Sequence, residues 1–329
     1  MRVLTFGEIM LRLTPSKRGE LLRNCGNMEV NFAGSESNVA TSLAALGHEV
    51  SFVTVLPKND IGLACKRSLN SHGIDTSKVQ FADGRLGTYF IEAGSSIRPS
   101  KVVYDREYSV FSLAGPEAFD WPTILEDKDW IFVSGITAAL SKNSANSLLS
   151  LLASARKVNT KIAFDMNYRR TLWKNVKNAK TFFQDAIKYV DLLFGNIGLL
   201  EDLLDFKKQQ TKTALITIAE RFDLQQICFT DRKHHSASLN ELQGFFYSEG
   251  EIYQSSPITV DITDRFGTGD AFAAGCLHGF FKNWPPEKII PFGSAAFALK
   301  HTIAGDQHLS SERDILAISE GNTTGHVLR

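Results

Sequence analysis

The chain has 329 residues, of which 43% are apolar and 22% are charged, and this composition excludes an intrinsically disordered protein. Its thirty-six basic residues balance thirty-six acidic ones, so no overall charge attracts nucleic acid or an anionic membrane. No apolar run approaches the roughly 20 residues that span a bilayer, and the N-terminal segment lacks the pattern of a signal peptide. We therefore expect a globular, cytoplasmic protein with no nucleic-acid or membrane partner.

The cysteines and histidines give no metal pattern. The four cysteines lie far apart without a C-x-x-C pair, which argues against a zinc cage and against a disulfide framework; they are Cys25, Cys65, Cys228 and Cys276. His234 and His235 are adjacent in a polar stretch that is typical of a solvated loop. We expect reduced thiols, and no metal ligands are predicted.

Strands and helices alternate along most of the chain. Residues 2–13 predict a strand, residues 37–46 a small-residue helix ended by Gly47, and residues 49–57 a buried strand. The pattern continues with expected helices near 60–72, 144–158, 178–189, 270–282 and 291–303, and expected strands at 161–167, 191–196 and 225–231. Strands separated by helices pair in parallel, so the sequence predicts an α/β fold with a mostly parallel central sheet and helices on both faces.

The region from Gly84 to Ala114 departs from this alternation. It contains β-rich runs punctuated by Gly and Pro and has no helical period. Together with residues 10–15 and 28–34 it predicts a small antiparallel sheet that projects from the body as a lid. We expect one α/β domain over residues 1–329, with the lid formed by segments of about 9–34 and 85–114. An apolar lid face would favour a homo-oligomer in which lid sheets pack together.

The stretch DRFGTGD, residues 264–270, is the strongest candidate for chemistry. If the backbone from Gly267 through Thr268 to Gly269 leads into a helix, its N–H groups and the helix dipole form an anion site. Asp270 then stands where it can accept a proton from a hydroxyl that attacks a phosphoryl group. The alternative is a glycine turn capped by Asp270. The helix terminus is expected to lower the pKa of this carboxyl.

Three further motifs contain polar residues suited to a sugar acid. In NFAGSESNVA, Gly34 permits close approach and Asn38 can donate to and accept from hydroxyls, although Ser35 or Ser37 can equally cap a helix. In DMNYRR, Arg169 follows a predicted strand, where ligands gather in open α/β sheets; an ordinary surface arginine is the alternative.

The third of these motifs lies in the expected lid. Tyr104 and Arg106 are two residues apart, on one face of a strand, and Tyr89 belongs to the neighbouring run. Their hydroxyl groups and cation suit a ligand with hydroxyls and a carboxylate. Exposed residues of an ordinary sheet would give the same pattern.

These motifs, in this order, resemble the ribokinase-like (PfkB) family of carbohydrate kinases. Two signatures match, namely AGSESNVATSLAALG and the D-x-x-G-x-G-D pattern followed by AFAAG. Within the family, the segments TFGEIMLRLTP, LPKNDIG, RPSKVVYDR, FDWPTI, DMNYRRTLW and ALKHTIAGD look most like 2-keto-3-deoxygluconate kinases. The resemblance covers nearly the whole chain.

The resemblance implies a Rossmann-type three-layer body, a β-sheet lid and ATP-dependent phosphorylation of the sugar acid at its terminal hydroxyl. It implies Asp270 as base, the backbone of Gly267, Thr268 and Gly269 as anion hole, and Arg169 beside them. The sugar acid would contact Gly34, Asn38, Tyr89, Tyr104, Arg106, Arg169 and Asp270. ATP would lie near Asn167, Asn196, Thr230, Asp231, Arg232, Gly267, Gly269, Ala298 and His301, with Mg²⁺ bridging its phosphates largely through water.

The chain also departs from the family pattern. Leu199 stands where relatives carry an acidic residue after the asparagine at 196, with Glu201 or Asp202 as substitutes, and FTDRKHHSAS lacks the glycine usual in the nucleotide loop. Three alternatives therefore stay open. They are a kinase for another sugar such as fructose, a sugar-acid sensor without catalysis, and, ranked last for want of a G-x-G-x-x-G motif, a dehydrogenase. The gluconate and galactonate epimers of the substrate are not distinguished.

Overall fold

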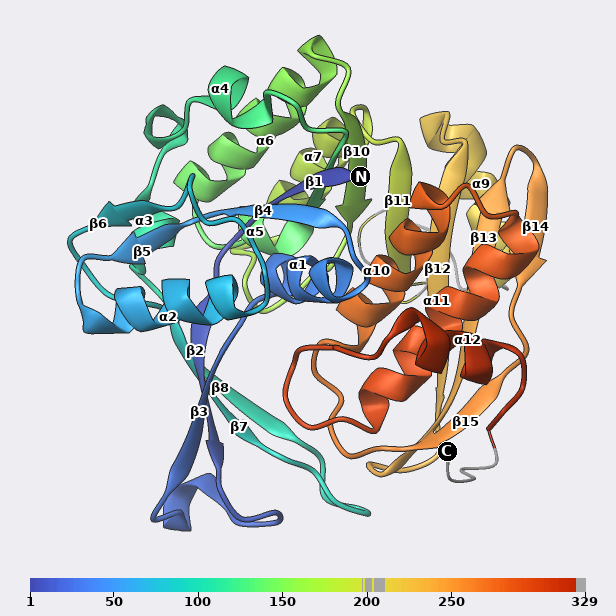
Figure 1. The fold of residues 1–329 in the computed structure, drawn as a ribbon, viewed down its shortest axis with the longest axis horizontal. Coiled ribbons are helices and arrows are strands. Elements are labelled where there is room, and N and C mark those ends of the chain that lie inside the picture. Colours follow the sequence, from blue (N-terminus) through green and yellow to red (C-terminus); the bar gives the residue numbers. More distant parts are fainter. Residues whose placement is uncertain (197, 199–202, 204–210, 324–329) are drawn as a thin grey trace.

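The computed structural model describes residues 1–196, 198, 203 and 211–323, and Figure 1 labels its elements. The strands are β1 (Arg2–Phe6), β2 (Met10–Pro15), β3 (Met28–Ala33), β4 (Glu49–Val53), β5 (Val55–Pro57), β6 (Gln80–Ala82), β7 (Thr88–Glu92), β8 (Lys101–Asp105), β9 (Trp130–Ser134), β10 (Lys161–Asp165), β11 (Leu192–Asn196), β12 (Gln226–His234), β13 (Leu239–Ser248), β14 (Glu251–Gln254) and β15 (Ile258–Asp261). The helices are α1 (Ser35–Ala45), α2 (Asp60–Ser71), α3 (Val110–Leu113), α4 (Trp121–Leu125), α5 (Gly135–Ala138), α6 (Lys142–Lys157), α7 (Val176–Ile187), α9 (Thr211–Phe222), α10 (Thr268–Phe281), α11 (Pro286–His301) and α12 (Glu312–Ser319), with short 3-10 turns η1 (Leu22–Asn24) and η2 (Pro116–Ala118).

The described ranges contain one large sheet of nine strands. Its order is β14-β13-β12-β11-β10-β9-β1-β4, with β15 also paired to β13. The six strands from β4 to β12 run parallel, whereas β13 is antiparallel to its three neighbours. Short apolar strands such as WIFVS of β9 are buried, as expected for parallel strands covered by helices. The predicted α/β class with a mostly parallel sheet is therefore confirmed.

Helices cover both faces of this sheet (Figure 1). One apolar cluster joins the sheet to α4, α6, α7 and α9, and a second joins the opposite face to α1, α2, α10 and α11. Along β1, Leu4 and Phe6 belong to the first cluster and Val3 to the second, because successive side chains of a strand point to opposite faces. The body is thus a three-layer α/β/α arrangement.

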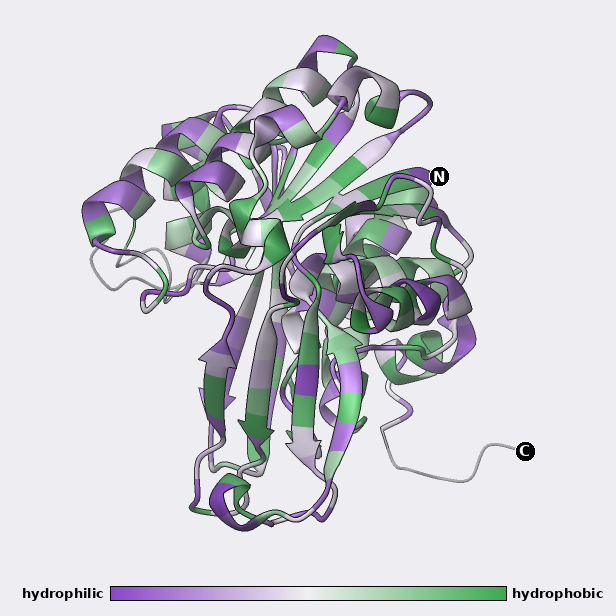
Figure 2. Cartoon of the chain, turned by 90° about the vertical axis from the view of Figure 1, so that its left-hand side faces the viewer, coloured by the Kyte–Doolittle hydropathy of each residue, from purple (hydrophilic) through white to green (hydrophobic). Residues whose placement is uncertain are grey.

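A second sheet, made entirely from residues 10–105, projects from the body (Figures 1 and 2). Its order is β3-β2-β7-β8, and it is named here the small sheet. The prediction of an antiparallel sheet is wrong in one respect, since β2 and β7 pair in parallel while the two outer pairs are antiparallel. The reason is that β2–β3 and β7–β8 are separate hairpins whose first strands meet side by side.

The tip of the small sheet reaches back to the body. In the turn between β7 and β8, the N–H of Ser96 donates to Oγ of Ser238 over 2.8 Å, and the Ser96 carbonyl accepts from the N–H of Ala237 over 2.9 Å. Val30 and Val103 are exposed on the sheet itself. That the small sheet acts as a lid, and that copies of the chain pack through it, stay predictions.

Most expected elements are present with shifted ends. Residues 2–13 were predicted as one strand but form β1 in the large sheet and β2 in the small sheet, because the chain leaves the body at Gly7. Helix α11 begins at Pro286 and not at residue 291, since Pro is well tolerated in the first turn of a helix. No described helix is long and apolar enough to span a membrane.

The cysteines and the paired histidines lie as follows. Cys65, Cys228 and Cys276 are buried and Cys25 is partly buried, all as free thiols. The expected loop is wrong for His234, which is the last residue of β12, because the strand continues through the polar stretch and pairs with β13; His235 follows it. The described residues contain no group of three or more His, Cys, Asp or Glu side chains that could hold a metal ion.

Candidate active site

A cavity of about 540 Å³ opens at the carboxyl ends of β10, β11 and β12, where open α/β sheets bind ligands. The turn before α10 and the side chain of Phe297 close its other side. Its lining brings together much of what the sequence predicted. The lining residues are Asp165, Asn167, Arg169, Phe194, Gly195, Asn196, Gly198, Thr230, Asp231, Arg232, His234, Arg265, Phe266, Gly267, Thr268, Gly269, Asp270, Phe272 and Phe297.

The two glycines of the turn differ in backbone conformation and in the space around them. Gly267 caps α10 in the left-handed conformation with φ of 70°, and a Cβ there would lie 1.8 Å from the backbone oxygen of Asp306. A Cβ on Gly269 would meet no atom within 4 Å. Gly267 is therefore required by the fold, whereas Gly269 leaves open space at the helix N-terminus, where N–H groups and the helix dipole favour an anion.

The apolar sequence after the turn explains how α10 is held. Almost all of its residues are buried, and its Gly275 lies so close to α11 that a Cβ there would come within 3.0 Å of the Gly293 backbone. Small residues thus allow α10 and α11 to pack closely and fix the position of the turn. This rigid support is what a preorganised anion site needs.

Asp270 stands at the start of α10 and is held by α1. The Ser35 hydroxyl donates to Oδ1 of Asp270 over 2.7 Å, and Nδ2 of Asn38 donates to Oδ2 over 2.7 Å. Ser35 in turn accepts a hydrogen bond from Nδ2 of Asn167 over 2.9 Å. The carboxylate is therefore oriented by two side chains from one helix and lines the cavity.

The expected direction of the Asp270 pKa was wrong. Burial raises the pKa of Asp270 to about 7, although the bonds from Asn38 and Ser35 oppose this, and the nearby carboxylates of Asp165 and Asp306 raise it further. The helix N-terminus favours the ionised form, but the loss of solvent outweighs it. A carboxyl group with a pKa near neutrality is suited to accepting a proton.

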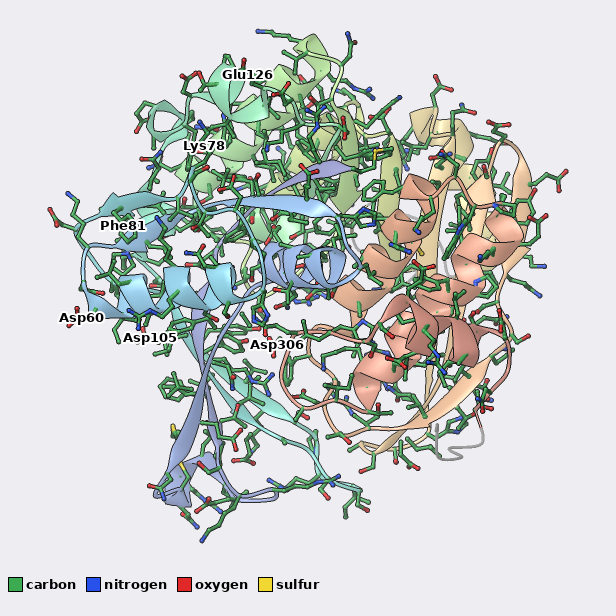
Figure 3. The ribbon with its side chains drawn as sticks, viewed as in Figure 1. Asp60, Lys78, Phe81, Asp105, Glu126 and Asp306 are labelled. Atoms are coloured by element: carbon green, nitrogen blue, oxygen red, sulfur yellow. The ribbon has the colours of Figure 1, made fainter. Side chains whose placement is uncertain are left out.

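The sequence did not reveal an ion-pair network that joins the small sheet to the turn. Arg12 of β2 pairs with Asp264 over 2.6 Å and with Asp306, and the Tyr89 hydroxyl donates to Asp306 over 2.5 Å. Oxygens of Asp264 also accept from the N–H groups of Phe266 and Gly305. Figure 3 shows Asp306 between the small sheet and the C-terminal helices. These residues lie far apart in the chain, so no local pattern could indicate their pairing.

The predicted sugar-acid contacts Tyr89, Tyr104 and Arg106 lie together, but Arg106 follows the end of β8 and does not share a strand face with Tyr104 as predicted. Arg106 is also not a free cation. Its Nε and Nη2 donate to Oε2 of Glu8 over 2.9 and 2.5 Å, and the pair is buried. The Arg106 guanidinium lies 5.6 Å from the centre of the Tyr104 ring, which stacks on Tyr89 at 6.0 Å. Nη1 of Arg106 is buried and has no partner among the described residues. One donor therefore remains for a ligand.

Gly34 has a structural explanation that the sequence did not indicate. It caps α1 with extended backbone, and a Cβ there would lie 2.1 Å from the backbone oxygen of Glu8. The close approach that it permits is therefore to the chain itself. Its predicted contact with a sugar acid stays a prediction.

The predicted nucleotide contacts divide into two groups. Seven of them line the cavity, namely Asn167, Asn196, Thr230, Asp231, Arg232, Gly267 and Gly269. Ala298 and His301 are buried and do not line it, because α11 turns Phe297 toward the cavity instead. Nδ1 of His301 bonds to the Phe297 carbonyl over 2.7 Å, and burial lowers the pKa of His301 to about 3. Leu199, Glu201 and Asp202 lie outside the described residues.

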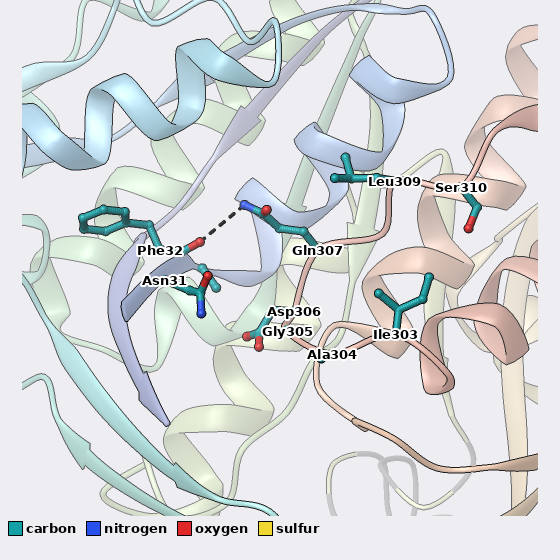
Figure 4. A pocket seen from close by; sticks show the side chains of 10 residues that line it. Asn31, Phe32, Ile303, Ala304, Gly305, Asp306, Gln307, Leu309 and Ser310 are labelled. Atoms are coloured by element: carbon teal, nitrogen blue, oxygen red, sulfur yellow. Dashed lines mark hydrogen bonds between the residues drawn. The ribbon is translucent and has the colours of Figure 1, made fainter. Parts of the chain in front are cut away.

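A second cavity, of about 360 Å³, lies between β3 and the loop after α11 (Figure 4). Gln307 bridges its walls by donating from Nε2 to the Phe32 carbonyl over 3.4 Å. Asp306 lines this cavity as well as binding Arg12 and Tyr89. The cavity therefore adjoins the ion-pair network that supports the turn before α10.

Comparison with known proteins identifies the family. A family model described as pfkB family carbohydrate kinase matches residues 1–313. The 2-dehydro-3-deoxygalactonokinase of Haloferax volcanii is 30% identical over 325 residues, which is 98% of this chain and 98% of that protein. The crystal structure of 2-dehydro-3-deoxygluconokinase from Thermotoga maritima has a TM-score of 0.94 at 34% identity and covers 98% of this chain and 100% of that one.

A further solved structure, a PfkB family carbohydrate kinase from Listeria grayi, has a TM-score of 0.92 at 32% identity and covers 97% of this chain and 100% of that one. The similarity thus extends over the body, the small sheet and the turn before α10 alike. Since both the family model and these relatives match almost the whole length, the chain belongs to the PfkB family of carbohydrate kinases and is a phosphotransferase.

Proposed function

We propose that this enzyme transfers the terminal phosphoryl group of ATP to the terminal hydroxyl of 2-keto-3-deoxygluconate, giving 2-keto-3-deoxy-6-phosphogluconate. The names of the Thermotoga and Haloferax relatives support a sugar acid as acceptor. The observation that carries the proposal is the buried Asp270 carboxyl, with a pKa of about 7, beside an open glycine turn in a 540 Å³ cavity. A base and an anion site are thereby next to each other.

In this mechanism Asp270 accepts the proton of the attacking hydroxyl, and Ser35 and Asn38 hold its carboxylate in place. The N–H groups from Gly267 to Gly269 stabilise the negative charge of the phosphoryl group in transit. Arg169, exposed at the cavity, adds a permanent positive charge beside it. Positioning and charge stabilisation supply most of the acceleration in phosphoryl transfer, so these parts suffice for the chemical step.

The residues of the cavity fit ATP, with arginines and backbone amides for its phosphates and Phe297 and Phe272 as apolar surface. Mg²⁺ usually needs only one or two protein carboxylates because it retains waters and phosphate ligands. Asp165 would supply such a carboxylate, since it lines the cavity and accepts one hydrogen bond, from the N–H of Asn167. When bound, the ion would neutralise charge on the phosphates.

The sugar acid would lie between Asp270 and the small sheet. Nη1 of Arg106 is the donor available for its carboxylate, and the exposed Tyr104 offers a hydroxyl, whereas the Tyr89 hydroxyl donates to Asp306 and could only accept from the ligand. Gly34 and Asn38 would border the same ligand from the start of α1. Because Glu8 neutralises Arg106, we assign the larger share of carboxylate binding to Arg169.

A rate comparison across acceptors tests the substrate. We expect 2-keto-3-deoxygluconate to give the highest kcat/KM, with 2-keto-3-deoxygalactonate as the second candidate because the Haloferax relative carries that name. Arg106→Ala should raise the KM for the sugar acid at least tenfold, and Arg85→Ala, which removes an exposed arginine next to the same sheet, should not. A preference for fructose, unaffected by Arg106→Ala, would contradict the sugar-acid assignment. Binding of the sugar acid without ATP turnover would favour a sensor.

A further inference from the structure

Three guanidinium groups line the cavity from different parts of the chain. Arg169 follows β10, Arg232 belongs to β12, and Arg265 lies in the turn before α10. None of the three forms an ion pair with a carboxylate in the part of the chain that the structure describes. Among the described residues, the cavity thus contains three guanidinium groups that form no ion pair within 4 Å.

Arg232 is fixed in place by the catalytic turn. Its Nη2 donates to Oγ1 of Thr268, the first residue of α10, over 3.2 Å, and its guanidinium lies 5.2 Å from the centre of the Phe297 ring. Burial, together with the charges of Arg265 and Arg169, lowers the pKa of Arg232 to about 10, so the group stays protonated at neutral pH. A fixed, charged donor therefore stands beside the anion site.

Arg265 is held from the other side of the turn. Its Nη2 donates to the Ala237 carbonyl over 2.7 Å, and its own carbonyl accepts the Thr268 hydroxyl over 3.1 Å. Thr268 therefore contacts both arginines, one through a side chain and the other through the backbone. The positive charges of Arg232 and Arg265 are therefore held on either side of the turn before α10, whose backbone N–H groups already favour an anion.

The acidic groups of the cavity do not neutralise this pair. Asp231 is exposed and accepts the N–H of Arg232, Asp165 accepts the N–H of Asn167, and Asp270 is bound by Ser35 and Asn38. Bringing like charges together costs free energy unless an anion completes the site. The arrangement is therefore suited to a ligand with several negative charges close together.

From this geometry we infer that Arg232 and Arg265 clamp the terminal phosphates of the nucleotide on either side of the turn at Thr268. Guanidinium groups bind phosphate oxygens through two parallel N–H bonds, which makes the clamp directional. The ligand class is a polyphosphate, and its identity as ATP rests on the proposed function. A carboxylate of the sugar acid has only one charge and does not account for two arginines.

Calorimetry with inorganic tripolyphosphate as the probe tests the clamp without sugar or turnover. Arg265→Gln and Arg232→Gln should each weaken tripolyphosphate binding at least about tenfold, since a hydrogen bond to a charged group is lost. In the same variants, the ratio of the ATP affinity to the adenosine affinity should fall. Arg265→Lys should recover part of the lost tripolyphosphate affinity. Binding of 2-keto-3-deoxygluconate should stay within twofold of the wild type, which also shows that the variants fold.

Lys233→Gln is the matched control, because Lys233 neighbours Arg232 on β12, is exposed, faces Glu241 and does not line the cavity. Equal losses in the control and the arginine variants would overturn the clamp, as would wild-type tripolyphosphate affinity in both arginine variants. A selective loss of sugar-acid binding would also overturn it. The proposed function fails separately: an enzyme that does not phosphorylate the sugar acid can still show the clamp.

Discussion

The ion pairs of Arg12 predict a large, pH-dependent loss of stability when that residue is replaced. Arg12 is 3% exposed and pairs with Asp264 and Asp306, both of which are at most 11% exposed at the side chain. Arg12→Met retains much of the apolar stem but leaves two buried carboxylates unpaired. Removal of one partner of a buried ion pair costs about 3–5 kcal/mol, and we expect a loss in this range for the free energy of unfolding at pH 8.

Urea unfolding of Arg12→Met and Arg85→Met measures the difference. Arg85 pairs with Asp105, but the two side chains are 40% and 63% exposed, so its loss should cost at most about 1 kcal/mol. Burial raises the pKa of Asp306 and Arg12 opposes this rise, so the pKa of Asp306 should rise further in the Arg12 variant. The folded variant then binds more protons than the unfolded chain. The difference in the free energy of unfolding between the variant and the wild type should therefore become smaller as the pH falls. An equal loss of unfolding free energy in both variants would refute the reasoning. So would a loss in Arg12→Met that grows as the pH is lowered.

Two further predictions concern the turn and the base. Gly267→Ala should lose both folding stability and activity, because a Cβ would meet the Asp306 backbone, whereas Gly269→Ala should melt near the wild-type temperature and show a raised KM for ATP. Equal melting temperatures for the two variants in a thermal scan would contradict this. The initial-rate profile of kcat/KM should rise with pH through about 7, since Asp270 must ionise. A profile that stays flat from about pH 5 to 9 would argue against Asp270 as the base.

Local sequence patterns predicted the elements and motifs whose physical cause is local. The glycine turn and the apolar run after it identify the start of α10, because backbone conformation and helix capping depend on neighbouring residues. The end of β10 predicted the position of Arg169 at the cavity for the same reason, whereas Asn167 came from the family resemblance. Alternation of strands and helices was likewise enough for the parallel sheet.

Long-range pairing accounts for what the sequence did not indicate. Arg106 and Glu8 are 98 positions apart, and Arg12 and Asp306 are 294 apart, so no spacing rule connects them. The pKa of Asp270 was predicted in the wrong direction because the burial that raises it arises only from tertiary packing, in which Asp270 contacts residues more than 230 positions away in the chain. Solvent exclusion, which dominates that pKa, exists only once the fold has formed.

Turnover by Asp270→Asn tests the central claim most directly. The amide keeps the size of the side chain, and its oxygen can still accept from Nδ2 of Asn38, while its NH2 group faces the Ser35 hydroxyl, which can rotate to accept. It cannot accept the proton of the attacking hydroxyl. We expect kcat for 2-keto-3-deoxygluconate to fall by about 10²–10⁴ while calorimetry shows sugar-acid and ATP affinities within threefold of the wild type. A variant that binds both ligands and retains kcat within tenfold would contradict the role of Asp270 as the catalytic base.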